Sequence, residues 1–153
     1  MYEFAIFKPN KSNSGVAAKI NTKGKVSFMR LSHQFAPMGS DKMFNWDAAV
    51  DVKLNANDMG WFKAVLRGRI NEIPGSTPER PGLFHKTAKD TKSIRLEYVE
   101  GRGFRLNVNK KPNGGELITF SLSLNFAEAE NLLDFLTLAS EEMFTPSYKK
   151  KDD

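Results

Sequence analysis

Hydrophobic and polar residues alternate through much of the first 54 positions, which is the pattern of half-buried β-strands. The alternation predicts four strands, over residues 2–8, 15–21, 25–35 and 44–54. Pro9-Asn10 ends the first strand, and Thr22-Lys23-Gly24 is typical of a hairpin turn. The fourth segment alternates most regularly, and its apolar face consists of Phe44, Trp46, Ala48, Val50, Val52 and Leu54. We therefore expect Trp46 to lie in the core.

After this segment the apolar residues recur at spacings of three and four, which predicts an amphipathic helix. Asn55 suits the N-cap position, and the Asp58 carboxylate suits the positive end of the helix dipole. Phe62, Val65 and Leu66 form the apolar side, and the helix is expected to end near Gly68. Residues 71–81 are rich in Pro, Gly, Ser, Thr and charge, so they predict an exposed connector.

The second half repeats this plan. It predicts strands over residues 83–87, 93–100, 103–111 and 116–124, then a helix capped by Asn125 with Glu128 at its third position. An offset of 70 residues places Leu54-Asn55 on Leu124-Asn125 and Asp58 on Glu128. The helix stripe consists of Leu132, Leu133, Phe135, Leu136 and Ala139.

The predicted fold class is therefore α+β, with two four-stranded antiparallel sheets each followed by a helix. We expect one domain over residues 1–145, made of pseudo-repeats at about 1–70 and 82–144. Residues 146–153 are expected to form a flexible tail.

The amino-acid composition excludes several kinds of catalytic and metal site. The 153 residues contain no Cys, which excludes a disulfide scaffold, Cys-ligated zinc and thiol catalysis. The sequence offers no Gly-rich phosphate loop and no paired carboxylates, and His33 and His85 lack further metal ligands at the usual spacing. We therefore expect a non-enzymatic protein without metal or cofactor. No apolar run is long enough to span a membrane and no targeting segment is visible, so we expect no membrane partner and a cytoplasmic, nucleoid-associated location.

Basic residues alternate with apolar ones on several predicted strands, and the formal net charge is +5. In residues 103–111 the outer face consists of Arg105, Asn107, Asn109 and Lys111, and neighbouring strands add Lys92, Arg95, Thr119, Ser121 and Ser123. Such a face can bind phosphates and hydrogen-bond bases without demanding one sequence. In residues 25–30, Phe28 beside Arg30 is a candidate base-stacking site. Residue types alone leave the alternative open that outward Arg and Asn serve solubility and that Phe28 is core.

An ordered set of short motifs adds to this picture. Three of these motifs resemble the Whirly family of single-stranded-DNA-binding proteins: Phe35-Ala36-Pro37, Phe44-Asn45-Trp46 and the helix start at Leu54-Asn55. Leu83-Phe84-His85-Lys86 and the stretch from Phe104 to Lys110 resemble two further family segments. The likeness covers residues 15–144. The family's Lys-Gly-Lys-Ala-Ala-Leu-Ser strand is absent, and Asn45 and Lys86 stand where the family has Asp.

The resemblance implies a Whirly-like fold, a homotetramer, and binding of single strands with little sequence preference. We accordingly expect a non-enzymatic single-stranded-DNA-binding protein of replication, recombination or repair, in a bacterial or phage setting. Two alternatives stay open: an RNA-binding protein of the same fold, and a structural oligomer or transcription regulator without general affinity for single strands. The candidate nucleic-acid-binding residues are Lys19, Lys23, Lys25, Phe28, Arg30, Lys86, Lys92, Arg105, Asn107 and Lys111. Whether His85 contacts the ligand or packs in the core is left open.

Overall fold

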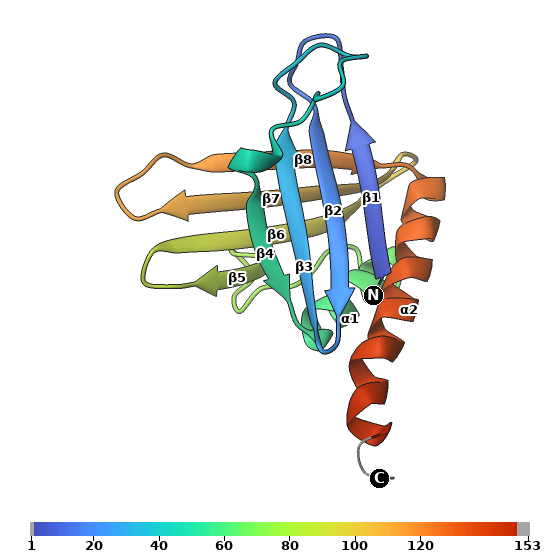
Figure 1. The fold of residues 1–153 in the computed structure, drawn as a ribbon. Coiled ribbons are helices and arrows are strands. Elements are labelled where there is room, and N and C mark those ends of the chain that lie inside the picture. Colours follow the sequence, from blue (N-terminus) through green and yellow to red (C-terminus); the bar gives the residue numbers. More distant parts are fainter. Residues whose placement is uncertain (1, 150–153) are drawn as a thin grey trace.

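The computed structural model describes residues 2–149, and the side chains of residues 2–144, as two four-stranded antiparallel sheets, each followed by a helix (Figure 1). The first unit contains β1 (Tyr2–Lys8), β2 (Val16–Lys23), β3 (Val26–His33), β4 (Val50–Leu54) and α1 (Ala56–Leu66). The second contains β5 (Leu83–Lys86), β6 (Asp90–Val99), β7 (Gly103–Pro112), β8 (Ile118–Leu124) and α2 (Phe126–Lys149). In both sheets the spatial order of the strands is their chain order, which confirms the predicted fold class.

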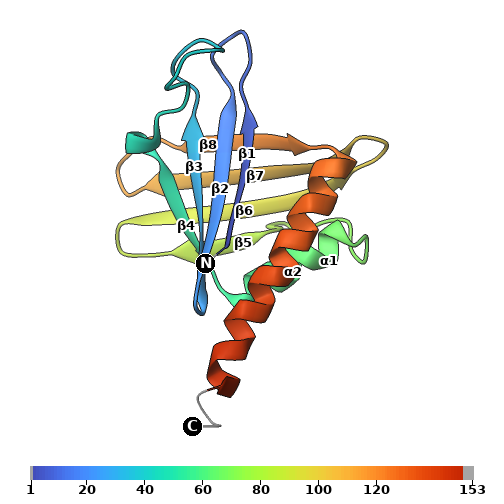
Figure 2. The same ribbon diagram turned by 45° about the vertical axis from the view of Figure 1, so that its right-hand side comes forward.

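The two sheets cross face to face, with the strands of one running crosswise to those of the other (Figures 1 and 2). Their inner faces supply one shared core. In the first sheet Met29, Leu31 and Val52 are fully buried, and in the second Ile94 and Val108 are. The outer faces of the two sheets therefore point to opposite sides of the molecule.

Both helices begin with the predicted caps. The Asp58 backbone N–H donates to Asn55 Oδ1 (2.8 Å), and Asp58 Oδ2 accepts from the Asn55 N–H (3.1 Å). Asn125 and Glu128 make the same reciprocal pair at 2.8 and 2.9 Å. Each pair satisfies two backbone N–H groups that the helix cannot. The helices also contact each other, and Lys63 Nζ of α1 donates to Ser140 Oγ of α2 (3.0 Å).

The segment from Phe44 to Leu54 is not one continuous strand, as its alternation predicted. Only Val50–Leu54 pairs with β3, while Phe44 makes an isolated bridge to Gln34 and Trp46–Ala48 form a short 3₁₀ helix. The Asn45 N–H donates to the His33 carbonyl at the end of β3 (3.0 Å). That carbonyl is therefore already hydrogen-bonded where the chain turns away from β3. Trp46 is consequently only partly buried and is not part of the core, and that prediction was wrong.

Several boundaries also differ. The hairpin of β2 and β3 turns at Gly24-Lys25, with Gly24 at φ +62°, so Lys25 lies in the turn and β3 begins one residue later than predicted, at Val26. The same strand ends at His33, two residues before the predicted end. At the other end of the chain α2 continues to Lys149, so residues 146–149, predicted as tail, are helical, and residues 150–153 lie outside the described residues.

Candidate nucleic-acid interface

The outer face of the first sheet carries Lys19, Lys23, Phe28 and Arg30 side by side. Lys19 pairs with Arg30 across β2 and β3, and Phe28 lies between Asn21 of β2 and Lys53 of β4. Because the inward positions of β3 are Ser27, Met29 and Leu31, Phe28 points away from the core and is 46% exposed. Neither helix covers this face (Figures 1 and 2).

One cation of this face already has a partner. Arg30 donates two hydrogen bonds to the Asp51 carboxylate of β4, from Nε (2.8 Å) and Nη2 (3.1 Å). These hydrogen bonds and the charge of Asp51 raise the pKa of Arg30 above its ordinary value. Both side chains are about half exposed, so a phosphate can compete with Asp51 for the guanidinium.

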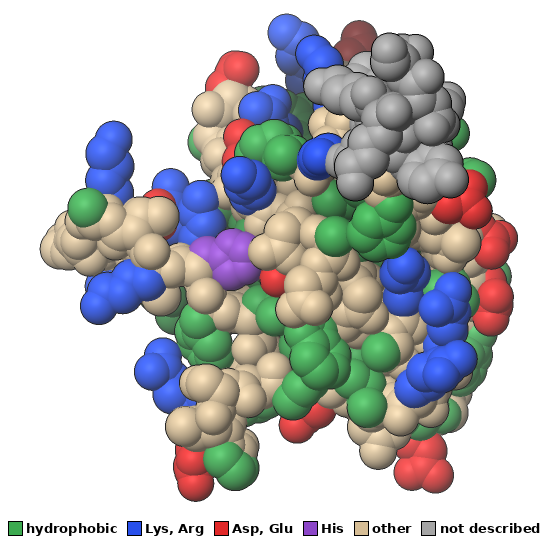
Figure 3. All heavy atoms as spheres, turned by 90° about the horizontal axis from the view of Figure 1, so that it is seen from below, with side chains coloured by type: hydrophobic (Ala, Val, Ile, Leu, Met, Phe, Trp, Pro, Cys, Tyr) green, Lys and Arg blue, Asp and Glu red, His purple; other side chains and the backbone are tan. Residues whose placement is uncertain are grey.

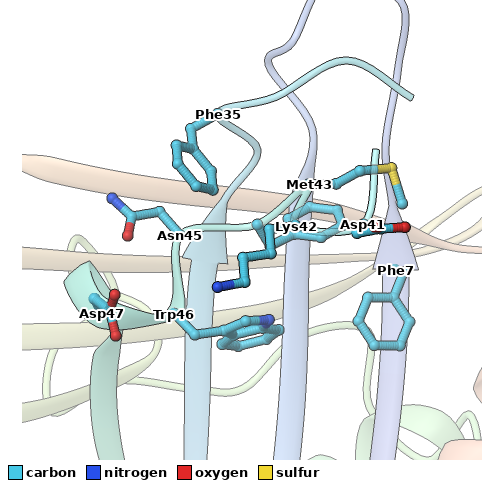
Figure 4. Close-up of a pocket in the computed structure, with 9 residues that line it drawn as sticks. Phe7, Phe35, Asp41, Lys42, Met43, Asn45, Trp46 and Asp47 are labelled. Carbon is cyan, nitrogen blue, oxygen red and sulfur yellow. The ribbon is translucent and has the colours of Figure 1, made fainter. Parts of the chain in front are cut away.

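An aromatic pocket of about 360 Å³ opens at the edge of this face. Its walls include Phe7 of β1, Phe35 and Trp46 (Figure 4). Lys19 Nζ lies 4.3 Å from the Trp46 ring centroid and 6.0 Å from that of Phe7, which is cation–π distance. The pocket therefore joins the predicted lysine to rings that sequence reasoning did not assign to the site.

One sequence signal could have indicated Phe7. The alternation of β1 places Phe4 and Ile6 inward, so Phe7 is an aromatic ring on the polar face, and it is 49% exposed. Phe35 was predicted to end the third strand but lies beyond β3, so alternation could not show its direction, and Trp46 was misplaced by its apparent alternation.

The two loops above the pocket are fastened by the Gln34 side chain. Gln34 Oε1 accepts from the Asn10 N–H (2.8 Å) and the Gly15 N–H (3.2 Å), both in the β1–β2 loop. Its Nε2 donates to the carbonyls of Asn10 and Ala36, each at 3.0 Å. The β1–β2 loop and the start of the β3–β4 loop are thus held to one amide group, which is buried.

The outer face of the second sheet carries Arg105, Asn107 and Lys111, as predicted from the alternation, and the register of β5 with β6 adds Lys86 to it. The serine and threonine side chains of β8 join this face beside β7. Glu97 of β6 lies between the arginines, 3.5 Å from Arg105 Nη1 and 3.7 Å from Arg95 Nη2. The charge of Arg105 is therefore partly balanced within the sheet.

Lys92 does not belong to that face. It pairs with Lys110 in the register of β6 and β7, so it points to the opposite side from Arg95, three residues further on. Its Nζ donates to the Asp51 carbonyl of β4 (2.7 Å), where the two sheets cross. The prediction that Lys92 and Arg95 share a face was wrong, because side chains three apart on a strand point to opposite sides.

The end of the second sheet that projects past β4 is rich in lysine. Two hairpin turns meet there, since Asn113 Nδ2 donates to the Ala88 carbonyl (2.6 Å). Figure 3 shows Lys and Arg side chains gathered around this projecting end. We call it the lysine end, and its members are Lys86, Lys89, Lys92, Lys110 and Lys111. Sequence reasoning missed Lys89 and Lys110.

The ten predicted residues therefore do not form one site. Four lie on the outer face of the first sheet and Lys25 in the turn beside it, four lie on the outer face of the second sheet, and Lys92 lies where the sheets cross. His85 points inward, with Nε2 3.6 Å from the Asp58 carboxylate. In residues 2–149 we find no group of His, Asp and Glu able to hold a metal ion, and no helix with the length and apolarity needed to cross a membrane.

The architecture defines a Whirly-like fold, as the motifs suggested. Among solved structures, the chain is similar to WHY3 from Arabidopsis thaliana, with 12% identity, a TM-score of 0.76, and coverage of 99% of this chain and 93% of that one. It is also similar to the plant transcriptional regulator PBF-2 (11% identity, TM-score 0.74, coverage 99% and 86%). A guide-RNA-binding protein complex bound to its RNA gives 17% identity, a TM-score of 0.65 and coverage of 90% and 88%. No protein-family model and no curated protein matches the sequence.

Proposed function

We propose that this protein binds single-stranded nucleic acid with little sequence preference and catalyses no reaction. The observation that carries the proposal is the outer face of the first sheet, where Phe28, Lys19 and Lys53 are presented together on an open surface. Lysine and arginine would neutralise phosphates, and exposed rings would stack on bases of any identity. The similarity to a guide-RNA-binding complex and to a transcriptional regulator supports this class of partner.

The path of the strand follows from the neighbours of this face. A nucleic-acid strand that crosses β4 would meet the lysine end, because Lys92 of the lysine end donates to the Asp51 backbone carbonyl of β4. The aromatic pocket lies on the β1–β2 side of the same face, beside Lys19. The open sheet would thus contact several nucleotides in succession, which suits a protein that covers exposed strands during replication, recombination or repair.

The test is fluorescence anisotropy with labelled single- and double-stranded DNA of one sequence. We expect the single strand to bind more tightly, and Phe28→Ala to weaken binding by about five- to 140-fold, the effect of losing one base–aromatic stack. The matched control is Phe126→Ala, because Phe126 is similarly exposed but lies at the start of α2. Failure to bind a thymidine oligonucleotide at low salt would refute the proposal.

RNA is the second candidate, because one of the similar structures is a complex with guide RNA. Competition between DNA and RNA oligonucleotides of equal length separates the two. Equal competition would indicate that the protein makes no use of the 2′-hydroxyl, whereas a clear preference for RNA would favour the second candidate.

We further propose assembly as a homotetramer. The exposed apolar side chains of α2, Leu138 and Phe144, give subunits a surface to bury. Light scattering on the eluting protein should give four times the 17.2-kDa mass of the chain. A monomeric mass at micromolar concentration would contradict this.

A further inference from the structure

We infer that the aromatic pocket receives one unstacked nucleobase of the bound strand, while Lys19 and Lys42 take the phosphates beside it. This inference rests on the proposed function and adds a particular subsite to it. The pocket lies where β1 and the β3–β4 loop meet, and Figure 4 shows Phe7, Phe35 and Trp46 around its opening with Lys42 reaching across.

The lining suits the two kinds of surface that a base presents. A base has flat apolar faces, and Phe7, Phe35 and Trp46 offer rings to them. A base also has a polar edge, and Asn45, Asp41 and Asp47 line the same pocket with hydrogen-bonding groups. The volume of about 360 Å³ lies within the range of small-molecule sites, about 300–1,000 Å³.

The polar groups of the lining are available to a ligand. Among the side-chain hydrogen bonds and ion pairs found within residues 2–144, none involves Asp41, Lys42, Asn45 or Asp47. The rings are also accessible, since Phe35 is 58% exposed and the 3₁₀ helix of Trp46 contains no buried residue. The rings of Phe35 and Trp46 are not part of the hydrophobic core, so core packing does not explain why they gather at this pocket.

The walls of the pocket are held in place before any ligand arrives. Gln34 fastens the β1–β2 loop to the start of the β3–β4 loop, and the Phe35 N–H donates to the Met43 carbonyl (2.8 Å). The Trp46 ring is fixed between Lys19 and Phe44, whose ring centroid is 6.4 Å away. A preformed pocket loses less entropy on binding than one that must be ordered by its ligand.

Tryptophan fluorescence reports on this pocket directly. The chain has two tryptophans, and Trp61→Phe leaves Trp46 as the only one. This variant is titrated with a thymidine 12-mer and with an abasic 12-mer that carries the same phosphates, while anisotropy measures binding of each. We expect the thymidine oligomer to quench Trp46 and the abasic oligomer to leave its emission unchanged at saturation.

Substitution of one wall supplies the second measurement. Phe35→Ala removes an exposed ring and should weaken thymidine 12-mer binding by about five- to 140-fold while leaving abasic 12-mer binding unchanged. Phe126→Ala is the matched control and should alter neither. Circular dichroism verifies that both variants stay folded.

The outcomes separate the inference from the proposed function. Tight binding of the thymidine oligomer with unchanged Trp46 emission, or with equal quenching by both oligomers, would overturn the pocket and leave nucleic-acid binding standing. Equal losses of thymidine and abasic binding in Phe35→Ala would also overturn it. Absence of binding by either oligomer would overturn the proposed function and the pocket together.

Discussion

Arg30 and Arg105 show how the charge of a candidate binding residue depends on its neighbours. Each was selected because it points outward from a strand, and each has a carboxylate partner in its own sheet, Asp51 for the first and Glu97 for the second. A phosphate must displace these partners, so the two arginines contribute less to binding than free lysines would.

Asp51→Asn should strengthen binding of single strands. The substitution frees Arg30 for phosphate, and a surface ion pair of about 0.2–1 kcal/mol corresponds to roughly a 1.4- to 5-fold gain in affinity. Anisotropy across a salt titration measures it, and the salt dependence should steepen by about 0.7 for one added phosphate contact. Asp134→Asn, on the exposed side of α2, changes the net charge equally and should have a smaller effect. Equal effects of the two variants would show that Arg30 is not in the site.

Lys63 gives a second prediction at this scale. Its partial burial, followed by the nearby charge of Arg67, lowers the pKa of Lys63 below its ordinary value of 10.5. Between the lowered pKa and 10.5 the unfolded chain binds more protons than the folded one, so the free energy of unfolding rises with pH in that window.

Lys63→Met should remove this rise, which is measured by urea denaturation at several pH values up to 10.5. Relative to the variant, the unchanged protein should therefore gain stability as the pH increases. Ser140 keeps its hydrogen bond to the Leu136 carbonyl in the variant (2.7 Å), so no buried hydroxyl loses its acceptor. A stability difference independent of pH would contradict the prediction.

Among the elements, the helix caps were predictable and the bend before β4 was not. A capping box depends on residues three apart, so Asn55 with Asp58 and Asn125 with Glu128 were visible in the sequence. The turn at Trp46 depends on the His33 carbonyl being occupied by Asn45, which is a contact between separate segments. The outward residues of β7 followed from alternation alone, whereas the aromatic pocket required the β3–β4 loop to be placed against β1.

Gly103, at the start of β7, tests how closely β7 approaches the end of β8. Its φ of +129° is a conformation that side-chain-bearing residues rarely adopt, and a Cβ there would lie 2.1 Å from the Leu124 carbonyl oxygen. Gly103→Ala should therefore cost more than about 2 kcal/mol of stability, because both the backbone strain and the clash oppose it. Gly101→Ala is the control: its φ is +74° and no other atom lies within 4 Å, so only strain of about 1–2 kcal/mol remains. Denaturant unfolding compares them, and equal losses would mean that β8 yields to the added methyl group.

For the molecule as a whole, the distribution of charge matters more than its total. The net charge of +5 is modest, yet five lysines gather at the lysine end. Lys110 there lies 3.9 Å from the Asp90 carboxylate, which leaves most of the group without a close acidic partner among residues 2–144. This surface should therefore dominate the long-range attraction of a polyanion.

The triple variant Lys86→Gln, Lys89→Gln, Lys111→Gln should flatten the salt dependence of single-strand binding by about two, if each lysine contacts one phosphate. The control variant Arg67→Gln, Arg69→Gln, Arg102→Gln removes the same charge near the other end of the second sheet. Its salt dependence should stay close to that of the unchanged protein. A larger change in the control would move the interface to that end.

Opposed outer faces have a consequence for long polymers. Because the two faces point away from each other across a single core, one short oligonucleotide cannot cover both. A particle with two separate attachment surfaces acts as a cross-linker, so the ratio of protein to polymer would decide between isolated complexes and networks. If the second face also takes up nucleic acid, this small basic domain would gather separate strands as well as coat them.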